Sequence, residues 1–365
     1  MVATIIDHII PFSGYLPSRE YPPVIAGPCS AESERQVLET ARQLARLPEV
    51  AAFRCGLWKP RTRPGEFEGV GAEGLAWLRK AKQETGLAIA VEVALPQHIE
   101  LCLKNEVDIL WIGSRTVVNP FSVNEIASAL KGVDVRVMVK NPVNPDLLLW
   151  IGALERLHQQ GIRKLAAVHR GFSAYHCKPF RNLPQWEIPI ELRRLVPDLP
   201  VLVDPSHISG NRAMLRPVMQ KAADLAFDGL MIESHVDPAN ALTDGDQQVS
   251  PKELADLLAR IEWPVNNANE VGREDAGENI RLSIVDLRLS IDEVDGEILR
   301  LLAERMELVK KIGARKKELG MDALQLERWT RLVEDRLEKG ASLGLSRNFL
   351  LKLLHTIHEE ALRIQ

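Results

Sequence analysis

Short apolar runs alternate with amphipathic stretches between residues 23 and 262. The amphipathic stretches cover, for example, residues 34–47, 74–86, 145–161 and 250–261, where apolar residues recur at helical spacing. The apolar runs are rich in β-branched residues and cover 23–30, 51–58, 87–94, 108–114, 135–142, 164–171, 200–207 and 229–235. Near-continuous apolar strands separated by helices are typical of a parallel sheet that is buried on both faces.

The repeated strand and helix units predict a fold of the α/β class. Eight consecutive units fit a (β/α)8 TIM barrel, which typically needs about 250 residues. The alternative is an open doubly wound sheet. No Gly-x-Gly-x-x-Gly turn follows the first apolar run, which argues against a dinucleotide-binding fold of that kind.

The pattern changes near residue 262, so we expect a second, smaller domain. Residues 263–277 lose their periodicity and gain Asn, Gly and charged side chains, which is typical of a linker. We therefore predict a barrel domain over residues 1–262 and an all-α domain over residues 278–365.

The all-α domain begins with a long apolar seam. Apolar residues recur at alternating spacings of four and three from Ile280 to Leu301, which predicts one helix over about 278–320. Two shorter helices are expected near 325–340 and 346–365. Three helices with one so long cannot cover their own apolar face, so we expect an intertwined homodimer through this domain, possibly within a homotetramer.

Composition narrows the class of protein. The chain has 46 Lys and Arg against 50 Asp and Glu, so its net charge gives no general attraction to nucleic acid. No apolar run approaches the length of a membrane span, and the first residues lack the basic region of an export signal. The four cysteines are scattered, which suits reduced thiols better than a disulfide framework. We expect a cytoplasmic protein that acts on small molecules.

Charged residues gather at the ends of the predicted strands, where a (β/α)8 barrel has its active site. These positions hold Cys29, Arg54, Arg115, Lys140, Arg170, His207 and Glu233. A charged side chain that ends an apolar strand is costly unless it is paired or used. A solvated surface would explain one such residue, but the whole set favours a functional site.

Part of this set suits a divalent metal ion. The candidate ligands are Cys29, His207, Glu233 and, from the loop after the last run, Asp244. Mixed sulfur, nitrogen and oxygen ligands favour a first-row transition metal over Mg2+. We expect Mn2+ first, and Co2+, Fe2+ or Zn2+ would also fit. His235 and Asp246 are competing ligands, and Cys29 alone could be a small core residue.

The remaining candidates are cationic. They are Arg54, Lys59, Arg61, Arg115, Lys140 and Arg170. Lys59 and Arg61 belong to the stretch WKPRTRPGEFEG, in which prolines flank the basic residues. Converging cations repel one another unless a ligand with several anionic groups binds between them. Phosphate and carboxylate groups are the obvious partners, since Arg can bind both through two hydrogen bonds.

Seven motifs carry a specific resemblance over about residues 20 to 262. They are IAGPCSAES, FRCGLWKPRTRPGEFEG, WIGSRT, VHRGF, VDPSH, IESH and ALTDGDQQ. In this order they resemble 3-deoxy-D-arabino-heptulosonate 7-phosphate (DAHP) synthases. The short chain and the form of the motifs are similar to the type I beta branch of that family. That family condenses phosphoenolpyruvate with erythrose 4-phosphate in the shikimate pathway and releases phosphate.

The resemblance assigns roles to the candidates. It implies a divalent metal on Cys29, His207, Glu233 and Asp244. It implies phosphoenolpyruvate binding by Arg54, Lys59, Arg115, Lys140 and Arg170, and catalytic roles for Lys59, Lys140 and His207. Arg61 and Thr62 would bind erythrose 4-phosphate.

One related family offers an alternative substrate. The 3-deoxy-D-manno-octulosonate 8-phosphate synthases use arabinose 5-phosphate and are similar at the metal and phosphoenolpyruvate sites. They carry Lys-Ala-Asn-Arg-Ser where this chain has KPRT, so the motif favours erythrose 4-phosphate. Arg63 departs from the serine that DAHP synthases usually have next. It could bind phosphate or point to solvent.

The helical domain resembles a second family. Continuing the seam places Arg305 on it, and Lys316 shares that face, which could be a coiled-coil surface with solvated cations. The stretches LRLSIDEVDGEILRLLAERMELVKKIGARKK and IHEEALRIQ resemble the all-α chorismate mutases. These rearrange chorismate to prephenate without a cofactor and form intertwined dimers.

The second resemblance implies a chorismate site. Its residues would be Arg305, Lys316, Gln325, Arg328 and Gln365, with Arg288 from the partner chain, and Arg305 and Lys316 would be catalytic. Many relatives have an acidic residue in place of Gln325 and a Glu in place of Trp329.

Together the two resemblances imply a bifunctional enzyme. The alternative is that the helical domain mainly senses chorismate or prephenate and dimerises the barrel, which the changes at Gln325 and Trp329 motivate. We also expect prephenate bound to the helical domain to inhibit the barrel, with reciprocal coupling of binding.

Overall fold

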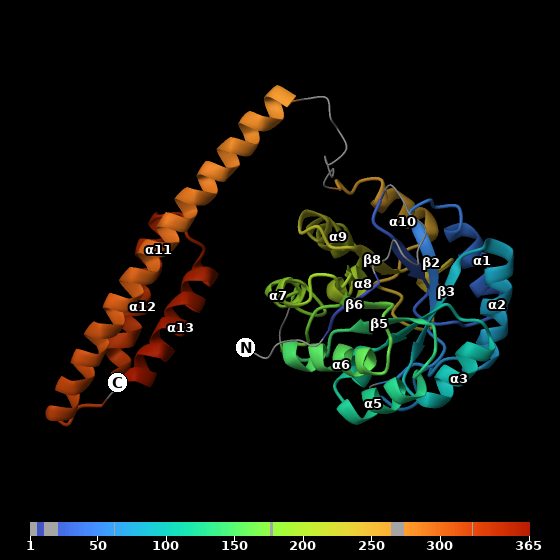
Figure 1. Cartoon of the computed structure of the whole chain (residues 1–365), viewed down its shortest axis with the longest axis horizontal. Coiled ribbons are helices and arrows are strands. Elements are labelled where there is room, and N and C mark those ends of the chain that lie inside the picture. Colours follow the sequence, from blue (N-terminus) through green and yellow to red (C-terminus); the bar gives the residue numbers. More distant parts are fainter. Residues whose placement is uncertain (1–5, 11–20, 62, 176–177, 264–273, 323) are drawn as a thin grey trace. The chain divides into compact units, whose positions relative to one another are not determined.

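A computed structural model shows a closed barrel and an all-helical unit (Figure 1). It describes residues 6–10, 21–61, 63–175, 178–263, 274–322 and 324–365, without the side chains of 274–286. The chain divides into two compact units, Met1–Val265 and Asn266–Gln365. Each unit is described by itself below.

The first unit is an eight-stranded parallel barrel. Its strands are β1 (Val24–Gly27), β2 (Val50–Cys55), β3 (Ala88–Val93), β4 (Ile109–Ile112), β5 (Arg136–Lys140), β6 (Leu165–His169), β7 (Val201–Val203) and β8 (Gly229–Glu233). Each strand pairs in parallel with the next, and β8 pairs with β1 to close the barrel. The predicted (β/α)8 fold is confirmed.

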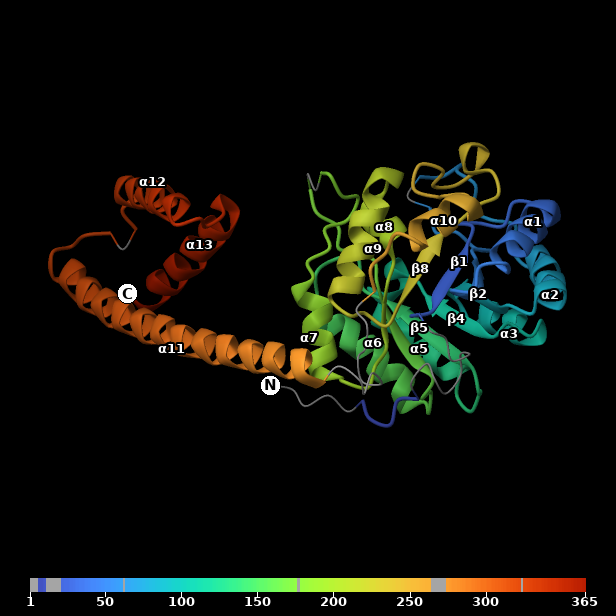
Figure 2. The ribbon, with the colours of Figure 1, turned by 90° about the horizontal axis from the view of Figure 1, so that it is seen from above.

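Helices surround the strands, as Figure 2 shows from a second side. They are α1 (Glu34–Leu44), α2 (Glu73–Thr85), α3 (Pro96–Lys104), α4 (Ser114–Val117), α5 (Pro120–Ala129), α6 (Leu147–Gln159), α7 (Glu187–Leu195), α8 (Pro205–Ser209), α9 (Leu215–Asp224) and α10 (Pro251–Leu258). Within the described residues, Arg212–Met214 and Pro238–Asn240 form short 3-10 helices. Local sequence fixes several helix starts. Ser250 and Glu253 form a capping box at α10, and Ser33 accepts a hydrogen bond from the Gln36 amide at α1.

Two apolar layers hold the barrel together. The larger lies between strands and helices, and the smaller fills the barrel interior, where Trp111 is its largest member and fully buried. Parallel strands covered on both faces bury side chains of both orientations, which explains the continuous apolar runs in the sequence. Most strand residues are therefore apolar, and the charged ones lie at or near the strand ends.

A glycine permits close packing at the mouth of the barrel. A Cβ atom at Gly27 would lie 2.0 Å from the carbonyl oxygen of Arg54, and Gly27 has a φ of +153°. Only glycine fits such an approach. The Gly-Pro-Cys turn after β1 thus lies directly against the end of β2.

The second unit contains three helices. They are α11 (Glu274–Glu318), α12 (Leu326–Ser342) and α13 (Arg347–Ile364), and α13 packs against both others. Helix α11 begins four residues before the helix start expected near residue 278, and residues 264–273 of the expected linker lie outside the described part. Glu274 and Asp275 are favourable at a helix N-terminus, where negative charge offsets the helix dipole.

The apolar seam of α11 is uncovered within one chain. The described seam side chains are 48–62% exposed, at Leu287, Ile291, Val294, Ile298, Leu301, Leu308 and Ile312. Core residues of a folded domain are normally buried, so this face lacks a partner within the described chain. None of the described helices is long and apolar enough to span a membrane.

Candidate active site

A polar cavity lies at the C-terminal end of the barrel strands. Its volume is about 660 Å³. The predicted cations that line it are Lys59, Arg61, Arg115, Lys140 and Arg170, together with Arg63 and Arg181. Acidic side chains on its wall are Glu66, Glu92 and Asp244. This concentration of positive charge fits a ligand with several anionic groups.

Arg54 lies beneath the cavity and does not line it. Its side chain is 1% exposed, its Nη1 lies 3.3 Å from Glu233 Oε1, and its guanidinium stacks over Trp111 at 4.9 Å. Residue 54 is still inside β2, and its side chain points into the barrel interior. Arg54 therefore contacts the metal-ligand candidates Glu233 and Cys29 from the barrel interior, not from the cavity.

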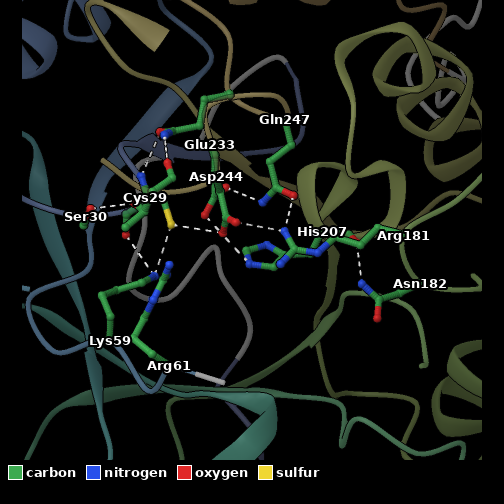
Figure 3. A network of polar contacts seen from close by, with 12 residues as sticks. Cys29, Ser30, Lys59, Arg61, Arg181, Asn182, His207, Glu233, Asp244 and Gln247 are labelled. Carbon is green, nitrogen blue, oxygen red and sulfur yellow. Dashed lines mark hydrogen bonds and ion pairs between the residues drawn. The ribbon is translucent and has the colours of Figure 1, made fainter. Parts of the chain in front are cut away.

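Three of the four predicted metal ligands come together. Ligand atoms of Cys29, Glu233 and Asp244 all lie within 4.8 Å of one another (Figure 3). The Cys29 thiol donates to Asp244 Oδ2 at 3.4 Å, and Gln247 Nε2 donates to Glu233 Oε2 at 2.6 Å. Glu233 Oε1 is buried and accepts no hydrogen bond from the described residues. Arg54 Nη1 lies 3.3 Å from this oxygen as an ion-pair partner, and a metal ion among Cys29, Glu233 and Asp244 would give it a further cationic partner.

His207 borders this group but is not within the same radius. Its Nε2 lies 3.8 Å from Glu233 Oε1, and its Nδ1 lies 2.8 Å from Asp204 Oδ2. Asp204 also binds Lys140 Nζ at 2.6 Å. A carboxylate behind a histidine fixes the ring orientation, as in many metal sites. Burial lowers the pKa of His207, and Asp204 opposes that effect.

The two competing ligands lie elsewhere. His235 Nε2 is 3.5 Å from Glu32 Oε2, and Asp246 is exposed. Neither belongs to the described group of close ligand atoms. The close group offers sulfur and carboxylate oxygen, and the imidazole of His207 beside it would make the donor set mixed, which suits a first-row divalent metal.

Lys59 joins the metal-ligand candidates to the cavity. Its Nζ lies 3.2 Å from both the sulfur and the carbonyl oxygen of Cys29. Burial alone would lower the pKa of Lys59, but Cys29, Glu92 and Glu233 raise it above its usual value. Lys59 is therefore a permanent cation at the point where the cavity meets the ligand group.

Neighbouring cations contribute to the lowered pKa of Arg170. The pKa of Arg170 is lowered to about 10, mainly by burial; Asp204 opposes this effect, and the charges of Arg181 and Arg115 add to it. Arg170 Nη1 donates to Asn182 Oδ1 at 2.7 Å. An anion bound among these groups would relieve the repulsion.

The loop after β2 borders the opposite side of the cavity. Arg61 Nε donates to Glu66 Oε2 at 2.8 Å, and Arg115 Nη1 donates to the carbonyl oxygen of Pro60. Thr62 lies outside the described residues. Arg63 lines the cavity, so its side chain is available to a ligand there.

The predicted chorismate-binding residues lie in the helical unit. Arg305 and Lys316 are half-buried on α11, and Gln365 follows α13 and packs on Gly313. Gln325 is half-buried at the start of α12, while Arg328 is exposed. Arg288 is exposed and lies about 25 Å before Arg305 along the helix, so one chain cannot place both on the same ligand.

The chain was compared with known proteins. Residues 19–268 match the model of the DAHP synthetase I family. The chain belongs to that family. Residues 287–365 match chorismate mutase type II. The protein is therefore a bifunctional shikimate-pathway enzyme, a DAHP synthase followed by a chorismate mutase.

Relatives of the synthase part agree with this assignment. A phospho-2-dehydro-3-deoxyheptonate aldolase of Thermotoga maritima is 31% identical over 65% of this chain and 68% of its own length. A 2-dehydro-3-deoxyphosphooctonate aldolase of Desulfotalea psychrophila is 26% identical over 65% of this chain and 88% of its own. A crystal structure of the Thermotoga maritima DAHP synthase matches with a TM-score of 0.59 and 29% identity, over 66% of this chain and 67% of that one.

Sequence reasoning missed several residues of the synthase site. Arg181 Nη1 donates to Asp244 Oδ1 at 3.1 Å and to Gln247 Oε1 at 2.6 Å, so it links two loops (Figure 3). Asp204 ends the apolar run of β7 and could have been found by the same signal as Glu233. Arg181 and Gln247 lie in loops, where no periodicity marks them.

Proposed function

We propose that the DAHP synthase barrel condenses phosphoenolpyruvate with erythrose 4-phosphate at a divalent metal on Cys29, His207, Glu233 and Asp244. The observation that carries the proposal is the close group of Cys29, Glu233 and Asp244 at the edge of a strongly cationic cavity. Mn2+ is the first expectation, and Co2+, Fe2+ and Zn2+ fit the same donors. When bound, the metal would polarise the aldehyde carbonyl of the sugar phosphate.

The side chains of the cavity would bind and orient phosphoenolpyruvate. Lys59, Arg115, Lys140 and Arg170 would hold the carboxylate and phosphate of phosphoenolpyruvate, and Arg54 would support them from below. The same cations stabilise the negative charge of the departing phosphate. Lys140 is held by Asp204 at 2.6 Å, so its ammonium is already oriented before a ligand arrives.

The sugar phosphate would occupy the side of the cavity formed by the KPRT loop. Arg61 and Arg63 line this side, and Glu66 holds Arg61. Arg61 and Thr62 are proposed to bind the phosphate of erythrose 4-phosphate. The alternative substrate is arabinose 5-phosphate, and the relatives include an aldolase named for each product type.

Phosphate release from phosphoenolpyruvate tests this assignment. With erythrose 4-phosphate we expect kcat/KM to exceed that with arabinose 5-phosphate by at least ~10²-fold, because each site is built around a different chain length. The assay is run with both sugars at matched concentration and enzyme amount. Faster phosphate release with arabinose 5-phosphate would instead indicate a 3-deoxy-D-manno-octulosonate 8-phosphate synthase.

We also propose that two chains cover each other's α11 seam. The exposed apolar residues from Leu287 to Ile312 support this, since a second copy offers an identical seam. The separation of Arg288 from Arg305 supports it too. In such a dimer Arg288 of one chain reaches the chorismate bound by Arg305, Lys316, Arg328, Gln325 and Gln365 of the other.

Joining both activities on one chain supports feedback control as a further proposal. Prephenate bound to the mutase unit is expected to weaken phosphoenolpyruvate binding or turnover by about 5- to 150-fold. Residues 1–262 alone, and the full chain with Arg305→Ala, should keep synthase activity and lose this inhibition. The measurement is phosphate release with increasing prephenate. Equal inhibition of the truncated barrel would contradict the proposal.

A further inference from the structure

Three buried polar atoms of the helical unit lack a partner. Among the described residues there, Arg305 Nη1, His358 Nε2 and Gln365 Oε1 are buried and make no hydrogen bond. A buried donor or acceptor without a partner costs free energy, so each needs an explanation. Arg305 and Gln365 belong to the proposed chorismate site. His358 has no assigned role.

The same three residues lie along one interface. Helix α13 packs on α11, and in Figure 1 both helices run toward the end of the unit where the C-terminus lies. A Cβ at Gly313 would come within 3.1 Å of Gln365 Cα, which aligns the end of α13 with that part of α11. His358 lies two turns before Gln365, and Arg305 lies about two turns before Gly313. His358 and Arg305 are therefore neighbours across the interface.

A tryptophan fixes the imidazole ring. Trp329 of α12 stacks on His358 with ring centroids 3.8 Å apart and planes inclined by 12°. A parallel stack covers the face of the imidazole and leaves its nitrogen atoms at the edge free to bind. Trp329 stands where many mutases carry a glutamate, so this chain lacks the acidic group there. Instead, Trp329 stacks on the imidazole of His358, which is the polar group beside it.

We propose that His358 is a further substrate-binding residue of the mutase, with Nε2 hydrogen-bonded to an oxygen of the dicarboxylate ligand and Trp329 as the residue that positions its ring. The inference rests on the chorismate site proposed above, since it takes Arg305 and Gln365 as ligand contacts.

The charges around His358 give the interaction a pH dependence. Burial lowers the pKa of His358, and the charges of Arg305, His355 and Lys316 lower it further. Arg305 and Lys316 come from α11 and His355 from α13, while α12 contributes the uncharged Trp329. A bound dicarboxylate offsets these cations and raises the pKa of His358. The ring then takes up a proton when the ligand binds.

The pKa difference of His358 between free and bound enzyme sets the direction in which affinity changes with pH. Because the pKa of His358 is higher in the complex than in the free enzyme, affinity for the dicarboxylate increases as pH falls through the higher pKa. It levels off below the lower one. One titrating group changes KM by at most tenfold per pH unit. Above both pKa values the neutral ring still binds, but more weakly.

The test compares two histidines of α13 in the full chain. We would measure kcat and KM for chorismate from pH 6 to 8.5 in wild type, His358→Gln and His355→Gln. His355 is exposed and meets Trp329 only in a tilted contact at 5.8 Å, so it is the matched control. In wild type and His355→Gln, KM should fall as pH falls. In His358→Gln, KM should be independent of pH and about tenfold higher at pH 6.

Calorimetry provides a second readout. Prephenate is titrated into each protein at pH 7 in two buffers of different ionisation enthalpy. Wild type and His355→Gln should take up a fraction of a proton, and His358→Gln should take up none. An unchanged pH profile and unchanged proton uptake in His358→Gln would overturn the inference. Absence of chorismate turnover and prephenate binding in wild type would instead overturn the proposed chorismate site itself.

Discussion

Replacing Arg305 by alanine is expected to lower kcat/KM for chorismate by about 10³-fold and to leave DAHP synthesis unchanged. The rearrangement is unimolecular, so the site works by holding the compact conformer and stabilising charge on the breaking C–O bond. Burial lowers the pKa of Arg305, and its Nη1 has no partner among the described residues. A cation in this setting interacts strongly with a bound dicarboxylate.

The measurement is the loss of chorismate absorbance with purified full-length protein. Arg315→Ala is the matched control, because Arg315 lies on the same helix but is exposed and pairs with Glu318 at 2.8 Å. It should retain activity within about twofold. Normal turnover in Arg305→Ala would remove Arg305 from the site. Absent turnover in wild type would leave the helical unit as a sensing and dimerisation module.

Loss of the metal is expected to abolish condensation and to spare the mutase. Chelation or Cys29→Ala should reduce phosphate release at least ~10²-fold, because polarisation of the aldehyde then depends on protein hydrogen bonds alone. Chorismate turnover needs no cofactor and should persist in the same samples. Adding back Mn2+ should restore the chelated wild type but not Cys29→Ala.

A second buried cysteine controls for changes in packing. Cys102 is as buried as Cys29, but it lies on α3 within the apolar layer between strands and helices. Cys102→Ala should keep its metal content, measured by elemental mass spectrometry after dialysis, and its condensation activity. Full activity of the metal-free wild type, or equal metal binding by Cys29→Ala, would contradict the proposed ligand set.

The barrel was predictable because its strands are buried on both faces. Glu233 and Lys140 each end such a strand, so an apolar run followed by a charge located them. Arg54 shows the limit of this argument. It is one residue inside its strand, and that offset places it beneath the cavity rather than on its wall.

Loop residues and helix starts were less accessible to prediction. Arg181 and Gln247 reach Asp244 and Glu233 from irregular segments whose path depends on tertiary packing. Helix α11 starts four residues before the expected position near 278, because its first turn is polar and acidic and resembles a linker in sequence. His358 was missed because its significance depends on neighbours from two other helices.

If the proposed dimer covers the open seam of α11, the ratio of the two activities would depend on enzyme concentration. The barrel closes its sheet and buries its apolar core within one chain. The proposed mutase dimer is governed by mass action, since each subunit acts as a stabilising ligand for the other. Dilution below the dimer dissociation constant would therefore abolish chorismate turnover while DAHP synthesis by the barrel continues.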